Sequence, residues 1–337
     1  MSADWWRLPP GAFNAITDVP GVRVGHCTRL GGGAATGVTA ILPHDGDLFD
    51  APVVAAAEVF NGFGKSAGLM QLTELGAIET PILLTGTFGV PACATALIRH
   101  AIGTQPGIGR DLPTVNPLVL ECNDGRVNDI QAMHLRPEDA LTAIAEAAGE
   151  APPQGTVGAG TGMRSFGFAG GIGTASRMVT VEGQEVRLGA MVLSNFGRAE
   201  DLRVRGEHLG AELGPVGPDA GSIVMVLATD APLSSRQLGR LARRCPAALG
   251  RMGSHIGHGS GDLAVAFSTA LPKRGDAALG ALRPSWPERG MDPLFAATVE
   301  AVEEAICAAL WHGVPHPGWR GDRLPAFATR FPGHAPR

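Results

Sequence analysis

The chain has 337 residues, of which 45% are hydrophobic and 18% charged, as in a folded globular protein of one large or two small domains. Its formal net charge of -5 is spread without long runs of one sign, so the composition predicts neither nucleic acid nor membrane as a partner. The five cysteines are scattered without a CxxC pair, which argues against structural zinc and favours reduced thiols in a cytoplasmic protein.

The first predicted elements in chain order are strands. The N-terminal segment lacks the basic and apolar regions of a secretory signal, and no later apolar run reaches the roughly 18 residues of a membrane span. Short apolar runs predict strands at 38–43, 51–60, 80–86 and 187–195. A further strand is predicted over 223–227, directly after Ser222.

Segments with helical periodicity are interspersed with these strands. The spacing predicts helices over 139–149, with a first turn from Pro137, over 235–245, with a serine cap, and from Asp292 to about Ala309. The elements do not alternate regularly, which favours a layered α/β or α+β fold over a parallel-wound sheet. Glycine and proline mark linkers at 101–116, 206–221 and 271–293, and the segment 314–337 is expected to be a poorly ordered or surface-draped tail.

A Gly-Ser bond at 221–222 joins a loop rich in glycine and proline to the predicted strand at 223–227. A flexible approach followed by a rigid strand suits a site of chain cleavage, after which Ser222 would be a new N-terminus. The alternative is an ordinary loop that enters a strand, because Gly-Ser pairs are common in loops.

Several other motifs are weaker. GKSAG at 64–68 matches G-x-S-x-G and would make Ser66 a nucleophile if it lay between a strand and a helix. HIGH places His255 and His258 three residues apart without a third metal ligand nearby, so loop histidines are the alternative. The glycine-rich stretches at 158–163 and 170–176 lack the strand, turn and helix order of a dinucleotide site.

Polar side chains crowd the segment ECNDGRVND at 121–129, which follows the apolar residues PLVL. Glu121, Asn123 and Asp124 lie at its start. Polar groups at the end of a buried strand often line a site. The alternative is an Asx turn closed at Asp124-Gly125.

Taken together, these segments resemble the self-processing serine aminopeptidases, a family that includes L-aminopeptidase/D-amidase-esterases and β-peptidyl aminopeptidases, with nylon-oligomer hydrolase as a more distant relative. The resemblance runs from about residue 13 to 310. The matching blocks, in order, are FNAITDVPGVRVGH, GVTAILP, FNGFGK, ECNDGRVNDI, VGAGTGMRSFGFAGGIGTASR, GAMVLSNFGR, GSIVMVLATDAPL and GSGDLAVAFSTA.

The resemblance implies an αββα sandwich with the architecture of an N-terminal-nucleophile hydrolase. It implies a single domain over 1–337 that cuts itself into chains 1–221 and 222–337, between Gly221 and Ser222. The processed units are expected to form a homotetramer without cofactor or metal. The implied substrates are small peptides, amides or esters with a free amine, and the enzyme would release their N-terminal residues, with D- or β-amino acids among those accepted.

The family also implies roles for individual residues. Ser222 would supply both the nucleophile and, through its new α-amino group, the base. Asn195 would donate to the oxyanion, and Ser260 and Asp262 would orient the nucleophile and its amine. Glu121 would bind the ammonium group of the substrate.

Two positions depart from the family pattern. Asn123 stands where the aminopeptidases commonly carry the tyrosine of E-T-Y-D-G, so an amide would replace a phenolic donor to the oxyanion. Ala169 replaces a lysine that often precedes a Gly-Gly pair. Two other functions therefore stay open: an amidase of the same fold that acts on ω-amino acid oligomers or pantetheine-like amides, and a non-catalytic binding protein with a degraded oxyanion hole.

Overall fold

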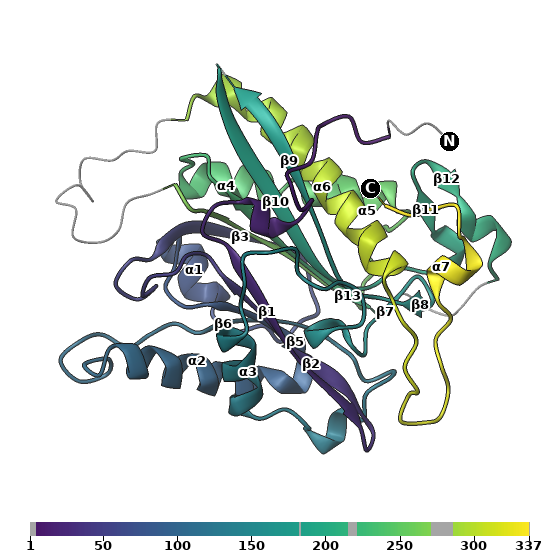
Figure 1. Ribbon diagram of the computed structural model, residues 1–337, viewed down its shortest axis with the longest axis horizontal. Coiled ribbons are helices and arrows are strands. Elements are labelled where there is room, and N and C mark those ends of the chain that lie inside the picture. The colour runs from purple at the N-terminus through teal and green to yellow at the C-terminus, as the bar shows by residue number, and fades with distance from the viewer. Residues whose placement is uncertain (1–4, 182, 215–220, 271–285, 337) are drawn as a thin grey trace.

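Two β-sheets lie face to face, with helices on both outer sides, in the computed structural model of the chain (Figure 1). The structure describes residues 5–181, 183–214, 221–270 and 286–336, and every statement below concerns these residues. The layer order is that of the αββα sandwich implied by the resemblance, and this prediction is confirmed. Both faces of each sheet are covered over most of its area, so several strands are buried along their whole length, whereas the strand at 23–31 carries charged and exposed residues.

The smaller sheet has four strands in the order β1-β2-β5-β6. Strands β1 and β2 form an antiparallel hairpin, β2 and β5 are antiparallel, and β5 and β6 are parallel. Their bounds are Arg23–Gly31 for β1, Ala34–Leu42 for β2, Ile82–Gly86 for β5 and Leu118–Cys122 for β6. Because β5 and β6 run in the same direction, their carboxyl ends meet at one edge of the sandwich.

The larger sheet has six strands in the order β4-β3-β14-β13-β10-β9. Its neighbours are antiparallel except for β13 and β14, which are parallel. The bounds are Val53–Gly62 (β3), Ala77–Ile78 (β4), Gly171–Val181 (β9), Gln184–Asn195 (β10), Ser222–Thr229 (β13) and Gly261–Ser268 (β14). Two short ribbons pair Arg164–Ser165 (β7) with Phe168–Ala169 (β8), and Arg203–Val204 (β11) with Glu207–His208 (β12).

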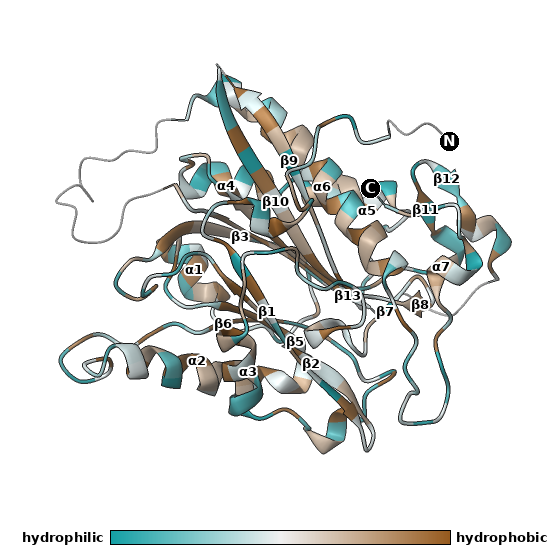
Figure 2. Cartoon of the chain, in the orientation of Figure 1, coloured by the Kyte–Doolittle hydropathy of each residue, from teal (hydrophilic) through white to brown (hydrophobic). Residues whose placement is uncertain are grey.

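The helices cover the two outer faces. Their bounds are Leu69–Leu75 (α1), Val90–Thr104 (α2), Pro137–Ala145 (α3), Ser235–Ala242 (α4), Cys245–Arg251 (α5), Met291–Trp311 (α6) and Phe327–Arg330 (α7). Helices α2 and α3 pack on the four-stranded sheet, whereas α4, α5 and α6 pack on the six-stranded sheet. Figure 2 shows brown, apolar residues along much of the strands and teal, hydrophilic residues on parts of helices α2, α3 and α4.

Strand β13 illustrates how one strand contributes side chains to two apolar layers. Ile223, Met225 and Leu227 pack among the helices, and Val224 and Val226 pack between the two sheets. Side chains of a strand alternate between its two faces, so a run without polar residues can bury both. The predicted strand at 223–227 is therefore confirmed, and the observed strand is longer at both ends, from Ser222 to Thr229.

The C-terminal part departs from the sequence prediction. The segment 314–337 is expected to be a tail, yet α7 places Phe327 and Phe331 in the core between the large sheet and its helices. Phe327 packs edge-to-face on Phe168, with 5.6 Å between the ring centroids. The aromatic spacing, rather than the surrounding glycine and proline, decides the position of this segment.

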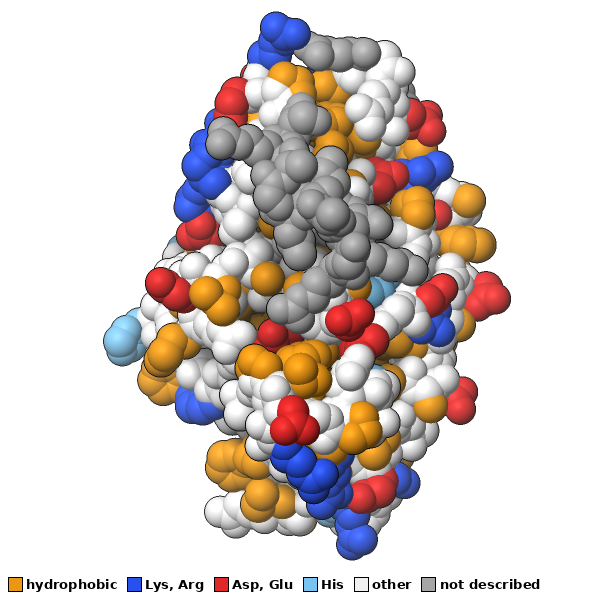
Figure 3. Space-filling model, turned by 90° about the vertical axis from the view of Figure 1, so that its left-hand side faces the viewer, with side chains coloured by type: hydrophobic (Ala, Val, Ile, Leu, Met, Phe, Trp, Pro, Cys, Tyr) orange, Lys and Arg blue, Asp and Glu red, His pale blue; other side chains and the backbone are white. Residues whose placement is uncertain are grey.

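The surface carries no segregated charge on the face shown in Figure 3, where acidic and basic side chains are mixed with apolar ones. This mixture agrees with the small net charge of the sequence. Among the described helices, none is both long enough and apolar enough to cross a membrane.

Candidate active site

Sheet order brings three of the predicted site residues together. Ser222, the first residue of β13, lies directly opposite Asn195, the last residue of β10, in the antiparallel ladder. On its other side β13 runs parallel to β14, where Asp262 lies opposite Ile223. The ends of three adjacent strands therefore place Ser222, the amide of Asn195 and the carboxylate of Asp262 within one small region.

A hydrogen-bond network surrounds Ser222, which is buried. The Gly261 N–H donates to Ser222 Oγ at 3.0 Å. Asp262 Oδ1 accepts from Ser260 Oγ at 2.6 Å and from the N–H of Ile223 at 3.1 Å. The carboxylate is thus anchored to the residue that follows the nucleophile, and Ser260 is anchored to the carboxylate.

The side-chain amide of Asn195 has a fixed orientation. Its Oδ1 accepts from the backbone N–H of Arg164 at 2.9 Å, and its Nδ2 donates to the backbone carbonyl of Asn123 at 3.1 Å. An amide nitrogen carries two hydrogens, so one N–H holds the group in place while the other is able to donate to an oxyanion.

Asn123 contacts this site through its backbone. Its side-chain Oδ1 accepts from the N–H of Gly125 at 2.9 Å, which closes an Asx turn, and its carbonyl is the acceptor for Asn195. An Asx turn closed at Asp124-Gly125 is therefore present, as the alternative interpretation of this segment predicts, and Asn123 supplies its side-chain acceptor. A carbonyl contact does not depend on the side chain, so it accommodates the departure from the family tyrosine.

Gly221 is closely packed where the loop meets β13. A Cβ atom at this position would lie 2.0 Å from the carbonyl oxygen of Asn195 and 2.7 Å from Phe196 Cα. Real Cβ atoms do not approach backbone so closely, and backbone atoms cannot move aside cheaply. Only glycine fits immediately before Ser222 in this arrangement.

Glu121 comes from the opposite sheet. It lies in β6, is buried, and accepts from the backbone N–H of Lys65 at 2.7 Å through Oε1. The hydroxyl of Thr87 donates to its Oε2. Each carboxylate oxygen can accept more than one hydrogen bond, so Glu121 retains acceptor capacity for a cationic group.

Cys122 connects the two sheets below the nucleophile. Its thiol donates to the carbonyl oxygen of Ser222 at 3.4 Å and lies 3.5 Å from that of Leu193. Burial raises the pKa of Cys122 well above its usual value, and the nearby carboxylates raise it further. The protonated thiol therefore acts as a donor that holds β6 against β13.

Two buried groups near this end of the sandwich titrate in opposite directions. Burial raises the pKa of Asp124 to about 6, and the charge of Glu121 adds to this effect, while Thr36 and Asn128 partly offset it. Burial lowers the pKa of His26 to about 4. Between pH 4 and 6 the folded state holds the extra proton at Asp124, whereas the unfolded state holds it at His26.

We expect the Asp124→Asn variant to show a stronger pH dependence of the unfolding free energy than the parent, because only the contribution of His26 remains. As the pH rises from 3.8 to 6, the raised pKa of Asp124 lowers the unfolding free energy by up to about 3 kcal/mol. As the pH rises from 4 to 6.5, the lowered pKa of His26 increases the unfolding free energy by about as much. The unfolding free energy of Asp124→Asn should therefore rise by about 3 kcal/mol from pH 4 to 6.5, whereas that of the parent stays nearly flat. Urea unfolding in a Ser222→Ala background keeps a single chain, and equal slopes for both proteins would contradict the assignment.

Three residues that contribute to the site had no predicted role in the sequence. Asn61 Nδ2 donates to the carbonyls of Gly257, His258 and Ser260, and so holds the loop before β14. Thr87 and Cys122 bind Glu121 and the Ser222 carbonyl, as described above. Asn61 lies in the block FNGFGK and Cys122 in ECNDGRVNDI, so the matching blocks marked these segments without giving the contacts.

The other motifs find no support as reaction centres. Ser66 lies between β3 and α1, but its Oγ is buried without a hydrogen-bond partner among the described residues, so no base activates it. His255 Nδ1 lies 4.0 Å from Asp201. Within the described part of the chain, no group of three or more His, Cys, Asp or Glu side chains is placed to hold a metal ion.

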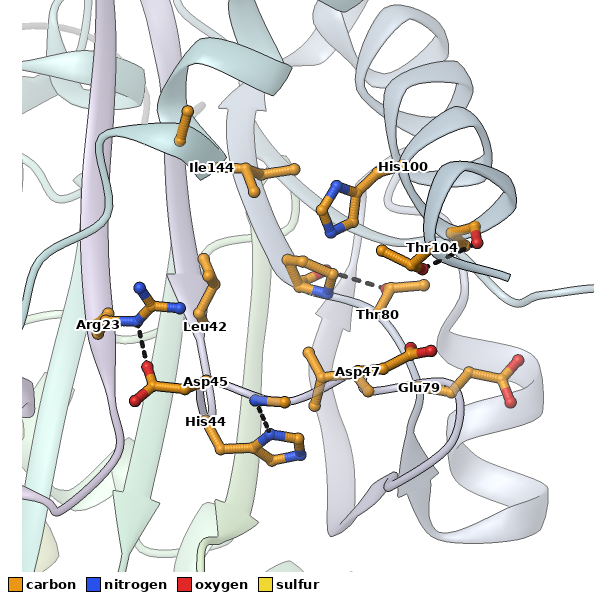
Figure 4. A pocket seen from close by; sticks show the side chains of 15 residues that line it. Arg23, Leu42, His44, Asp45, Asp47, Glu79, Thr80, His100, Thr104 and Ile144 are labelled. Carbon is orange, nitrogen blue, oxygen red and sulfur yellow. Dashed lines mark hydrogen bonds and ion pairs between the residues drawn. The ribbon is translucent and has the colours of Figure 1, made fainter. Parts of the chain in front are cut away.

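A cavity of about 330 Å³ lies beyond the amino end of β5, away from the predicted site residues (Figure 4). Arg23 pairs with Asp45 at its rim, and the ring of His44 accepts from the backbone N–H of Gly46. Asp47 and Glu79 accept hydrogen bonds from neighbouring protein groups. Several polar groups at this cavity are thus bonded to neighbouring protein groups, and none of the predicted catalytic residues lines it.

The chain resembles known peptidases in sequence over most of its length. The model of peptidase family S58 matches residues 14–324. The β-peptidyl aminopeptidase BapA of Sphingosinicella microcystinivorans is 38% identical over 330 residues, which cover 89% of this chain and 82% of the relative.

Two solved structures share the whole fold. The PH0078 protein from Pyrococcus horikoshii OT3 superposes with a TM-score of 0.91 at 45% identity, covering 96% of this chain and 93% of that one. The L-aminopeptidase D-Ala-esterase/amidase from Ochrobactrum anthropi, a serine aminopeptidase with a variant of the Ntn hydrolase fold, gives 0.87 at 33% identity, with 97% and 98% covered. The protein described here is a serine aminopeptidase and belongs to peptidase family S58.

Proposed function

We propose that this hydrolase cleaves its own Gly221-Ser222 bond and then uses the new N-terminal Ser222 to release N-terminal residues from small substrates. The observation that carries the proposal is the position of Ser222 at the first residue of β13, between the amide of Asn195 and the carboxylate of Asp262. Buried Glu121 stands on the opposite sheet and supplies a negative charge for a free amine.

Self-cleavage needs no group from outside the chain except water. Ser222 Oγ attacks the carbonyl carbon of Gly221, the C–N bond breaks, and the acyl group passes from nitrogen to oxygen as an ester. Water then hydrolyses this ester and leaves the Gly221 carboxylate and the Ser222 amine. The tight packing of Gly221 holds the scissile bond in place for this step.

The same serine then acts on substrates. Its α-amino group, with a reference pKa of about 7.7 to 8.0, takes the proton from Ser222 Oγ as this oxygen attacks the substrate carbonyl. Asn195 Nδ2 donates to the oxyanion, and the protonated amine returns its proton to the leaving group. Water releases the acyl group, while Asp262 and Ser260 keep the amine and nucleophile aligned.

The substrate class follows from Glu121 and from the relatives. A buried carboxylate that binds an ammonium group selects substrates with a free amine over N-blocked ones. The relatives act on β-peptides or on L-amino and D-alanyl compounds, as their names state, so we propose small peptides, amides or esters with α-, β- or D-amino residues. ω-Amino acid oligomers and pantetheine-like amides are the second candidate class. Both contain an amide that Ser222 could attack, and the oligomers also end in a free amine.

We further propose that the processed 1–221 and 222–337 chains stay associated as one domain and assemble as a homotetramer. Strand β13 lies between β10 and β14, so the two chains share one sheet after cleavage. Denaturing electrophoresis should give two bands near two-thirds and one-third of the 34.7 kDa chain. N-terminal sequencing of the smaller band should begin at Ser222, and a start at any other residue would reject the proposed cleavage.

Removal of the oxyanion donor should act on turnover rather than on binding. Asn195→Ala is expected to lower kcat by roughly 10²- to 10³-fold with little change in KM, because the donor strengthens its contact only as negative charge develops. Steady-state kinetics on a β-alanyl amide measures both constants.

Asn123→Ala serves as the matched control for this experiment. Asn123 contributes its backbone carbonyl, which alanine retains, so its kcat should stay within about 10-fold of the parent. If Asn123→Ala lost as much as Asn195→Ala, the side chain of Asn123 would also be needed to hold the oxyanion, and if only Asn123→Ala lost activity, Asn195 would not be the donor.

A further inference from the structure

We propose that Gly64 sets the length of the residue that the enzyme accepts, by leaving open the space between the nucleophile and the ammonium-binding carboxylate. This inference rests on the proposed function, because it assigns Ser222 and Glu121 to the two ends of the bound residue. It makes Gly64 a specificity-determining position for the number of carbons between the amine and the scissile carbonyl.

The geometry that carries the inference is the place of Gly64 between both ends of the site. A Cβ atom at Gly64 would lie 3.4 Å from Glu121 Oε1 and 4.0 Å from Gly261 Cα, and nothing else beyond its chain neighbours would lie within 4 Å. The N–H of Gly261 is the group that donates to Ser222 Oγ. A side chain at position 64 would therefore enter the space that separates the carboxylate from the nucleophile.

The neighbours of Gly64 leave this space unfilled. The backbone N–H of Lys65 binds Glu121, but its ammonium group lies over the ring of Phe63, 4.4 Å from the centroid. Phe63 is itself 57% exposed, so this pair lies at the surface. The Lys65 ammonium group is thus directed to Phe63 rather than to the carboxylate of Glu121, which accepts from the Lys65 backbone N–H and the Thr87 hydroxyl.

The number of carbons between the amine and the scissile carbonyl of the substrate must fit the fixed separation between Glu121 and Ser222 in the protein. One carbon joins the amine and the carbonyl of an α-amino residue, and two carbons join those of a β-amino residue. A methyl group at position 64 occupies about the volume of the additional methylene. Gly64 does not adopt a left-handed backbone conformation, so alanine fits the backbone there and the effect is one of space.

The test compares glycyl and β-alanyl p-nitroanilides with parent, Gly64→Ala and Gly64→Val proteins. For Gly64→Ala, the ratio of kcat/KM for β-alanyl to glycyl substrate should fall about 10-fold or more, and Gly64→Val should lower it further. Gly149→Ala is the matched control, because a Cβ at Gly149 would meet nothing within 4 Å, and its ratio should equal that of the parent.

A second experiment measures ligand binding without turnover, so it tests the role of Gly64 independently of the proposed function. Ethanolamine and 3-aminopropanol carry an amine and a hydroxyl on two and three carbons, and calorimetry measures their affinities without turnover. Gly64→Ala should lower the affinity for 3-aminopropanol more than the affinity for ethanolamine.

The outcomes of the two arms are distinct. If the parent hydrolyses neither p-nitroanilide but Gly64→Ala still selectively weakens the binding of 3-aminopropanol, the proposed reaction of Ser222 with these substrates is rejected and the role of Gly64 is kept. Equal effects on both substrates and both ligands would overturn the role of Gly64 alone. A Gly64→Ala protein that remains uncut on a denaturing gel would also overturn it, because Gly64 would then act in cleavage.

Discussion

A Ser222→Ala variant should remain a single 34.7 kDa chain and lose hydrolysis of free-amine amides by at least about 10⁴-fold. The substitution removes the oxygen that we propose attacks both the Gly221 carbonyl and the substrate. It would also prevent release of the proposed basic amine, so one change removes both proposed functional groups. Electrophoresis and a p-nitroanilide assay measure the two losses on the same preparation.

Ser66→Ala is the control for this experiment, since Ser66 lies in the competing G-x-S-x-G motif. It should be processed and should hydrolyse substrate as the parent does. Full activity in Ser222→Ala, or loss of activity only in Ser66→Ala, would move the nucleophile to Ser66. Equal circular dichroism spectra for the variants show that each loss is chemical rather than structural.

Glu121→Gln should lower kcat/KM for a free-amine substrate by about 10³-fold, because loss of one partner of a buried charge pair costs about 2 to 5 kcal/mol. The amide is close in shape to the carboxylate but cannot offset the charge of the substrate ammonium. Discrimination should fall with it, so the ratio of free-amine to N-acetylated substrate turnover approaches one. Steady-state kinetics on the paired substrates measures both effects.

Glu79→Gln is the matched control, because Glu79 also accepts a backbone N–H, that of Asn116 at 2.7 Å, but lies at the separate cavity beyond β5. Its kinetics should equal those of the parent. Retention of the free-amine preference in Glu121→Gln would show that another group binds the ammonium.

The sequence predicts the elements of this fold better than their arrangement. The apolar runs at 38–43, 51–60, 80–86 and 187–195 all lie within or overlap strands, because continuous apolar segments bounded by turns bury both faces. Helix α4 begins after the predicted serine cap, where Ser234 Oγ accepts from the N–H of Gln237 at 3.3 Å. Local signals suffice for such elements, whereas the buried position of Phe327 in the expected tail depends on a distant partner, Phe168.

The partners of the buried charges in the core are also not predictable from the sequence. Arg177 in β9 is fully buried and pairs with Glu304 at 2.6 Å and with Glu300 at 3.0 Å, both in α6. The sequence predicts a helix from Asp292 to about Ala309, but nothing in it marks Glu300 and Glu304 as the partners of a buried arginine. A buried charge requires such a pair, and only the packing of α6 on the sheet supplies it.

By itself, the sequence determined the strand that begins at Ser222, the matching blocks and the residue types of the site. Tertiary structure decided the contacts: Asn195 lies opposite Ser222 because β10 pairs with β13, and Asp262 reaches the Ile223 N–H across 39 residues because β13 pairs with β14. Glu121 comes from the other sheet. Local preferences fix which residues form a strand, but the order of strands depends on burying both sheet faces at once, and this order builds the site.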